Sequence, residues 1–143
     1  MKTYLNPFRL TTYLLILYCA GHTVGALVQT PHFGPGADAV LEAMKTTHFL
    51  ANGSDCTWYG YYLGFGYLVS IFFLFAAVVT WHLGGLAPPQ QRAAAPLAGA
   101  LFVAFAAGTY LAARWFFLPP VVFSSLITLL LGWQCLRLLR APA

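Results

Sequence analysis

Four long apolar stretches constrain this chain more than any other feature of its sequence. Of its 143 residues, 60% are hydrophobic and only 7% are charged, whereas soluble domains carry about 25% charged residues. A helix needs about 20 apolar residues to cross the hydrocarbon core of a bilayer. We therefore predict an all-α membrane protein, a single domain whose four transmembrane helices cover residues 10–28, 57–83, 93–115 and 121–139.

The basic residues predict how these stretches cross the membrane, because positively charged side chains favour the cytoplasmic side. If the N-terminus is inside, two basic residues, Lys45 and Arg114, lie at outer ends of the stretches. The remaining basic residues lie at inner ends, and they are Lys2, Arg9, Arg92, Arg137 and Arg140. We predict an N-in, C-in topology with an extracytoplasmic loop over residues 29–56.

Within this loop we predict one short amphipathic helix at residues 37–50. Asp38 and Glu42 fall in its first turns, where the helix dipole favours acidic side chains. Asn52-Gly53 follows as a helix-stop signal. By its i, i+3, i+4 spacing, the apolar face consists of Val40, Leu41, Met44 and His48. We expect this face to rest on the membrane surface or to cap the bundle.

Small residues recur every four positions in three of the apolar stretches. A Gly-x-x-x-Gly step places two positions without side chains on one helix face, where another transmembrane helix can approach closely. We predict helix packing at these positions, which are Gly21, Gly25, Gly60, Gly64, Ala100, Ala104 and Gly108.

His22 is the polar residue that lies deepest in an apolar stretch. One interpretation is a neutral imidazole that bonds a carbonyl or hydroxyl of a neighbouring helix. The other is a functional histidine, because ionisable residues inside membranes are costly. As a catalytic acid or base it would work with Glu42 or Asp55. The corresponding ligand-binding site would be formed by His22, His48, Tyr59 and Tyr62.

Known cofactor and catalytic motifs are missing from the sequence, and we predict neither a cofactor nor a resident metal. The alternative is a metal or haem held by His22 and His48, because neutral imidazole is a common ligand. The basic residues form no run, so we expect no nucleic-acid partner. The spacing of the cysteines leaves open whether Cys19 and Cys56 pair.

Several segments of the sequence together resemble a known family. They are GHTVGAL from residue 21, GPGADAV from residue 34, MKTTHF from residue 44, WYGYYLGFG from residue 58 and FFLPP from residue 116. In this order they resemble a family of small uncharacterised bacterial four-helix membrane proteins, whose GHTxG and FYxGFG-like segments are the most distinctive. The resemblance implies the four-helix fold and a bacterial inner-membrane location, and it implies no activity.

Two functional hypotheses follow from these patterns. The first is a non-catalytic protein that packs against partner membrane subunits or copies of itself through its glycine and alanine positions, as an accessory subunit or homo-oligomer. The second is a binding protein or enzyme for a lipophilic ligand of the quinone, sterol or lipid kind. Its site would lie at the outer mouth of the bundle around His22. In both cases membrane lipid surrounds the chain.

Overall fold

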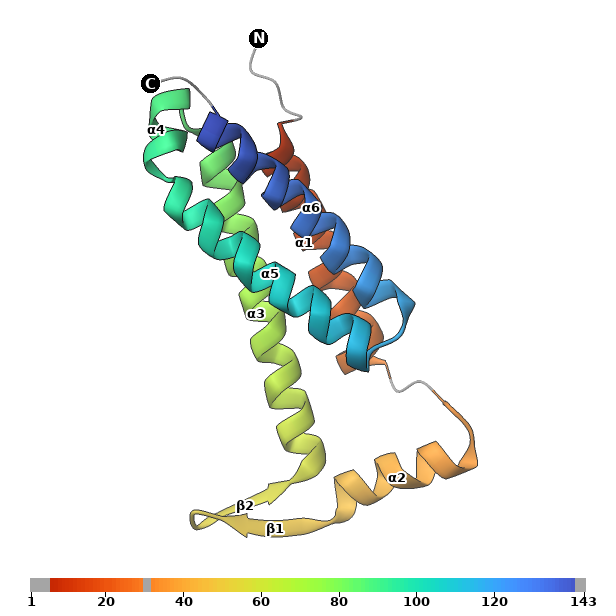
Figure 1. Ribbon diagram of the computed structural model, residues 1–143. Coiled ribbons are helices and arrows are strands. Elements are labelled where there is room, and N and C mark those ends of the chain that lie inside the picture. The colour runs from red at the N-terminus through yellow and green to blue at the C-terminus, as the bar shows by residue number, and fades with distance from the viewer. Residues whose placement is uncertain (1–5, 30–31, 141–143) are drawn as a thin grey trace. The chain divides into compact units, whose positions relative to one another are not determined.

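The described part of the chain is mostly helical and contains one small β-hairpin (Figure 1). The computed structural model describes residues 6–29 and 32–140. Among these residues, four helices are long and apolar enough to cross a membrane, namely Pro7–Val28, Trp58–Gly85, Ala95–Trp115 and Leu118–Arg140. The predicted all-α membrane class is thus confirmed by helix length and composition. Lys2, on which the topology prediction partly rests, lies outside the described residues.

The elements follow one another in the order α1 (Pro7–His22), η1 (Thr23–Val28), α2 (Pro35–Thr46), β1 (His48–Ala51), β2 (Ser54–Thr57), α3 (Trp58–Gly85), α4 (Pro88–Ala93), α5 (Ala95–Trp115) and α6 (Leu118–Arg140). η1 is a π-helical continuation of α1. α5 covers the third predicted stretch from residue 95 onward, and the residues just before it form the short helix α4. α6 begins before residue 121, because its two prolines occupy the first turn, where a missing N–H costs no helical bond.

The chain divides into two compact units, the first made of Met1–Tyr18 with Phe73–Ala143 and the second of Cys19–Phe72. Helices α1 and α3 are each divided between the two units, α1 after Tyr18 and α3 after Phe72. In the first unit, α5 and α6 form an antiparallel helical hairpin (Figure 1). The hydroxyls of Thr109 on α5 and Thr128 on α6 lie 2.9 Å apart and link the two helices. The large buried side chains of this pair are Leu101, Phe105, Ile127 and Leu131.

The first unit also joins the start of α1 to the end of α3. Asn6 Oδ1 accepts the Arg9 N–H at 3.0 Å, which caps α1, and Asn6 Nδ2 donates to Gly84 O at 2.7 Å. One turn further on, the buried hydroxyls of Thr12 and Thr80 lie 2.8 Å apart. One of the two hydroxyls donates to the other, and a carbonyl of its own helix lies within hydrogen-bond distance of each, Phe8 O at 3.1 Å and Ala76 O at 2.9 Å.

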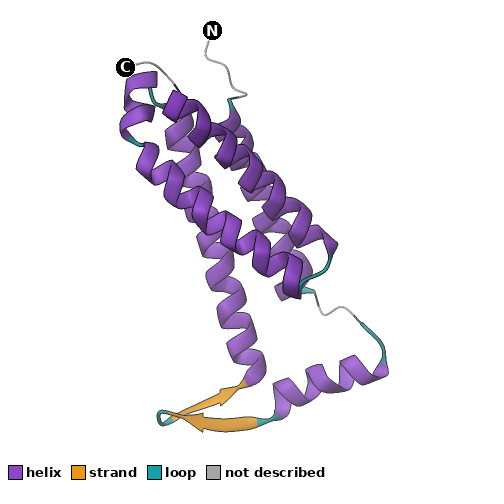
Figure 2. Cartoon of the chain, viewed as in Figure 1, coloured by secondary structure: helices purple, strands orange, loops and turns teal. Residues whose placement is uncertain are grey.

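In the second unit, a two-stranded antiparallel hairpin comes directly before α3 (Figure 2). The predicted helix over residues 37–50 was wrong at its C-terminal end, because α2 ends at Thr46 and residues 48–51 form β1. Asn52 and Gly53 connect the strands with φ angles of 51° and 83°. Positive φ at both residues is the requirement of a type I′ hairpin turn, for which Asn-Gly is the preferred pair. Asn52-Gly53 therefore reverses the chain between two strands.

Aromatic side chains hold this hairpin against the first turn of α3. The Phe49 ring of β1 lies 4.8 Å from the Trp58 ring and 5.8 Å from the Tyr61 ring, measured between centroids. Thr57 Oγ1 accepts the Gly60 N–H at 3.0 Å, as the side chain of an N-cap residue does. The end of β2 and the start of α3 are therefore fixed by the same few residues.

Candidate functional site

A set of polar groups joins the end of α1 and η1 to the first half of α3. His22 Nε2–H donates to Gly66 O at 3.1 Å, and Ser70 Oγ donates to the same carbonyl at 3.3 Å. Ser70 Oγ also lies 2.9 Å from Thr23 Oγ1, and Cys19 Sγ donates to Ser70 O at 3.5 Å. We call these five residues the polar seam. In an apolar environment such bonds satisfy groups that water does not reach.

Two further contacts continue the polar seam toward the loop. Gly66 has no side chain, and the buried Leu27 side chain of η1 occupies the space where its Cβ would lie. Tyr62 Oη donates to Ala26 O at 3.0 Å. The last carbonyls of a helix have no partner within that helix, so the Tyr62 hydroxyl satisfies one of them at the end of η1.

The geometry of His22 fits the first of its two interpretations. Its Nε2 proton points at the peptide carbonyl of Gly66, and a peptide carbonyl does not take up protons at ordinary pH. The imidazole is half-buried and holds two helices together. The assignment of His22 as a catalytic acid or base stays a prediction, and its observed partner is a structural one.

The other predicted site residues form two small groups, one within the hairpin and one between α2 and the start of α3. His48 Nδ1–H donates to the Asp55 carboxylate at 2.9 Å, which links β1 to β2 across the hairpin. His48 was predicted on the apolar face of a helix, and this was wrong because it lies in a strand. In the second group, Lys45 Nζ lies 3.9 Å from the Glu42 carboxylate and 5.3 Å from the centre of the Tyr59 ring.

No three side chains of His, Cys, Asp or Glu in the described parts of the chain gather closely enough to hold a metal ion. His22 and His48 lie on different elements and bond different partners. A metal or haem between them stays a prediction. The cysteines Cys19, Cys56 and Cys135 are free thiols, so Cys19 and Cys56 are not paired in this structure.

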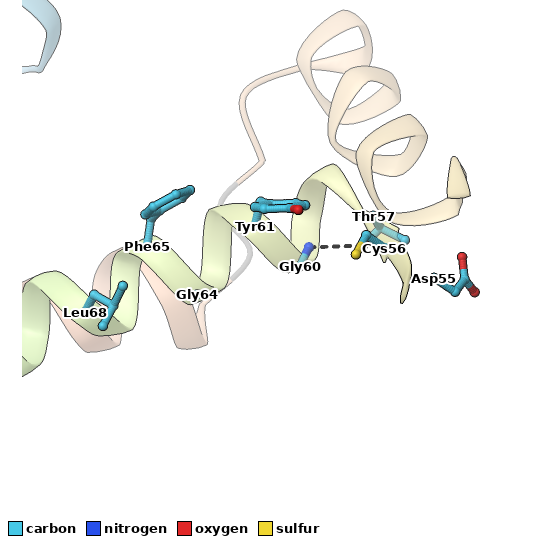
Figure 3. Close-up of a pocket in the computed structure, with 8 residues that line it drawn as sticks. All are labelled: Asp55, Cys56, Thr57, Gly60, Tyr61, Gly64, Phe65 and Leu68. Atoms are coloured by element: carbon cyan, nitrogen blue, oxygen red, sulfur yellow. Dashed lines mark hydrogen bonds between the residues drawn. The ribbon is translucent and has the colours of Figure 1, made fainter. Parts of the chain in front are cut away.

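An open groove runs along the other side of the first half of α3 (Figure 3). Its volume is about 640 Å³. Tyr61, Phe65 and Leu68 project along it, and Gly60 and Gly64 form its floor. At the end toward the hairpin it is lined by Asp55, Cys56 and Thr57. The groove is therefore polar at the hairpin end and apolar along the helix.

The groove and the polar seam occupy opposite faces of α3. Residues 60, 61, 64, 65 and 68 follow the i, i+3, i+4 spacing of one face. At about 100° per residue, Tyr62, Gly66 and Ser70 fall on the opposite face. Of the predicted site residues, Asp55 lines the groove, whereas His22 and Tyr62 belong to the other face. The structure does not bring them together in one pocket.

The glycines that pack inside the chain are not those of the predicted steps. A Cβ added at Gly66 would collide with Leu27, and one at Gly132 would lie 3.0 Å from the Phe102 ring. A Cβ added to the predicted packing glycines Gly21, Gly25, Gly64 and Gly108 would meet nothing within 4 Å, and at Gly60 it would meet only Thr57 Oγ1 of the preceding residues, at 3.3 Å. Packing at these predicted positions therefore stays a prediction for contacts with another chain.

Several residues of the polar seam were missed from the sequence. Cys19 and Thr23 are four positions apart, as are Gly66 and Ser70. Small polar or side-chain-free residues at this spacing form a face on which a transmembrane helix makes hydrogen bonds. The glycine pairs share this four-residue spacing. Within the chain, however, α1, η1 and α3 bond through the face that carries the hydroxyl and thiol groups.

No family model, curated protein or solved structure matches this chain. The class of protein therefore rests on the chain itself, which has four helices able to span a membrane by length and composition. It is an α-helical membrane protein by these criteria, with a short helix and a β-hairpin between its first two long helices.

Proposed function

We propose that this protein works without catalysis, as a small membrane subunit that packs against another transmembrane helix through the groove on α3. The partner that we consider first is a second copy of this chain. The observation that carries the proposal is the floor of the groove, where a Cβ at Gly64 would meet open space and one at Gly60 would meet only the Thr57 hydroxyl. Such a floor lets a second helix approach closely, and in membranes close packing drives association.

The packing inside the chain supports this reading of the groove. Gly66 and Gly132 lie against neighbouring side chains, so their small size has an internal reason. In the described residues no such reason exists at Gly64, where a side chain would meet open space. The flanking rings of Tyr61 and Phe65 offer apolar walls for the partner.

A second open face on α5 supports an accessory role in a larger complex. Ala100 and Ala104 are exposed, and a Cβ added at Gly108 would meet nothing within 4 Å. A chain with small-residue faces on both α3 and α5 has room for two neighbours, either copies of itself or other membrane subunits.

The location and orientation belong to the same proposal. We place the protein in a bacterial inner membrane, N-in and C-in, with residues 29–56 outside the cytoplasm. The sequence resemblance supports the location. The excess of basic residues near the start of α1, in α4 and at the end of α6 supports the orientation.

The test of the groove is self-association in lipid vesicles. Labelled copies of the full chain are mixed over a dilution series of protein in lipid, and the dimer fraction is measured by energy transfer. Gly64→Leu fills the floor and is expected to weaken association about tenfold or more, a loss of about 1.4 kcal/mol. The matched control is Gly99→Leu, because Gly99 also faces open space but lies outside the groove. Monomeric wild-type protein at all dilutions, or equal losses in the two variants, contradicts self-association through the groove.

The polarity of the groove favours a second candidate function, the binding of a lipophilic ligand with a polar head. The carboxylate of Asp55 and the hydroxyl of Thr57 lie at one end, and Phe65 and Leu68 at the other. Such a ligand would sit in the groove rather than beside His22. Mass spectrometry of protein purified in mild detergent tests this, and Phe65→Ala should lower the amount of ligand that co-purifies.

A further inference from the structure

The arginines of the first unit have no acidic side chain of that unit to pair with. The chain contains three acidic residues, Asp38, Glu42 and Asp55. All of them belong to the second unit. An ion pair of a first-unit arginine with an acidic side chain therefore requires an acid from outside that unit.

Four of these arginines lie at one end of the first unit. The start of α1 is bonded to the end of α3, as Asn6 and Gly84 show. The short helix α4 follows α3 and packs against α6, whose last residue is Arg140 (Figure 1). The arginines at this end are Arg9, Arg92, Arg137 and Arg140.

Two of these arginines contact neutral side chains, and a third has a buried N–H group without an acceptor among the described residues. The Arg9 guanidinium lies 3.4 Å from the centre of the Trp81 ring, which is a cation–π contact. Arg137 Nη1 donates to Gln134 Oε1 at 3.4 Å. Gln134 is only 4% exposed, so a buried residue one turn earlier on α6 holds the Arg137 side chain in place. Arg92 Nε is buried and has no acceptor among the described residues.

A small pocket on α6 combines two of these guanidinium groups with an aromatic and an aliphatic side chain. Its lining residues are Trp133, Leu136, Arg137 and Arg140, and its volume is about 360 Å³. They follow the i, i+3, i+4, i+7 spacing of one helix face. Trp133 and Leu136 are 63% and 52% exposed. The apolar side chains lie deeper in the span, and Arg140 lies at its end.

We propose that this pocket binds the headgroup phosphate of an anionic phospholipid. Arg137 and Arg140 donate to the phosphate oxygens, because the planar guanidinium matches a phosphate with two parallel hydrogen bonds. Trp133 and Leu136 contact the glycerol region and the first carbons of the acyl chains. Arg92 adds a third positive charge from the neighbouring helix α4.

A lipid fits this pocket better than a soluble anion does. The pocket lies at the end of a helix that is long and apolar enough to span a membrane, which places Arg140 at headgroup level and Trp133 at the interface. Inorganic phosphate would use the two guanidinium groups and leave both apolar side chains uncovered. An amphiphilic ligand uses all four side chains of the pocket.

The test compares two lipids on the full-length protein. The protein is placed in nanodiscs with equal amounts of phosphatidylglycerol and phosphatidylcholine of the same acyl chains. The lipid retained by the protein is then identified by native mass spectrometry. We expect the wild type to retain phosphatidylglycerol preferentially. Replacing Arg137 or Arg140 by glutamine should reduce that preference about fivefold each, the effect of one basic residue at an anionic surface.

The matched control is Arg114→Gln in the last turn of α5, which lies outside the pocket. Arg114 likewise lies beside a tryptophan, because its guanidinium is 4.6 Å from the centre of the Trp115 ring. This control variant should leave the preference unchanged. Circular dichroism verifies folding of each variant, and if Arg137→Gln does not fold, Arg140→Gln alone decides. Equal retention of both lipids by the wild type, an undiminished preference in Arg140→Gln, an equal loss in Arg114→Gln, or displacement of the lipid by millimolar inorganic phosphate overturns the proposal.

Discussion

Replacing His22 by alanine separates a structural histidine from a catalytic one. The change removes the Nε2–H bond to Gly66 O and part of the contact between α1 and α3. Hydrogen bonds between transmembrane helices contribute about 0.6 kcal/mol on average and at most about 1.7 kcal/mol. Gly66 O keeps its bond from Ser70 Oγ, so the carbonyl is not left without a partner. The bond itself therefore belongs at the low end of that range.

Lost packing adds to this value, because the imidazole is half-buried. Together we expect His22→Ala to lower the free energy of unfolding by about 1–2 kcal/mol. The assay is reversible unfolding in mixed micelles, with helix content followed by circular dichroism over a titration with a denaturing detergent.

His82→Ala is the matched control for this measurement. His82 Nδ1–H donates at 2.8 Å to Val78 O, a carbonyl of its own helix, and its side chain is exposed. Its loss breaks no link between helices, so we expect a change within about 0.5 kcal/mol. Equal losses in the two variants would refute the reasoning about the polar seam. A loss above about 3 kcal/mol in His22→Ala would also refute it, because the loss of one hydrogen bond and part of the packing does not explain so large a value.

Two further substitutions test the packing and the turn of the second unit. Gly66→Ala forces a methyl group against the buried Leu27 side chain. We expect it to lower the free energy of unfolding by about 1–3 kcal/mol in the same assay. An unchanged unfolding midpoint would contradict this and would mean that Leu27 moves aside freely. Gly53→Ala places a side chain at φ 83°, which costs about 1–2 kcal/mol, so the hairpin amides should exchange hydrogen about tenfold faster. Gly36→Ala, at a helical position with open space, should show no such increase.

The long helices were predictable because their signal is local. Each apolar stretch is long enough to demand a helix on its own, so the observed spans lie close to the predicted ones. The differences occur where two local signals compete. The prolines at the start of α6 indicate either a turn or a first helical turn, and packing against α5 favours the helix.

The hairpin was missed because its decisive pair has two meanings. Asn-Gly ends helices and also reverses strands, and the apolar residues before it continue the spacing of α2. What distinguishes the two is the segment after the pair, since Ser54–Thr57 pairs with His48–Ala51. The placement of His48 depended on this choice, and its partner Asp55 was therefore not predicted.

The polar seam was only partly predictable because the sequence does not show which helix faces meet. His22 was recognised, and a bond to a neighbouring helix was one of its two interpretations. Gly66 and Ser70 are identified as its partners by the rotation of α3, which three-dimensional packing sets. A small-residue step predicts that a face permits close approach, and it does not predict which chain uses that face.

The π-helical segment η1 has a consequence for the length of the chain. A π turn is equivalent to an α-helix into which one residue has been inserted. Within Thr23–Val28 the chain therefore holds one residue more than an α-helix of the same length needs. A deletion there would be absorbed by closing the turn to α geometry, and the residues before it, including His22, would keep their direction. The same deletion within α3 would turn every later side chain by about 100°, so the two sides of the polar seam differ in how much change of length they tolerate.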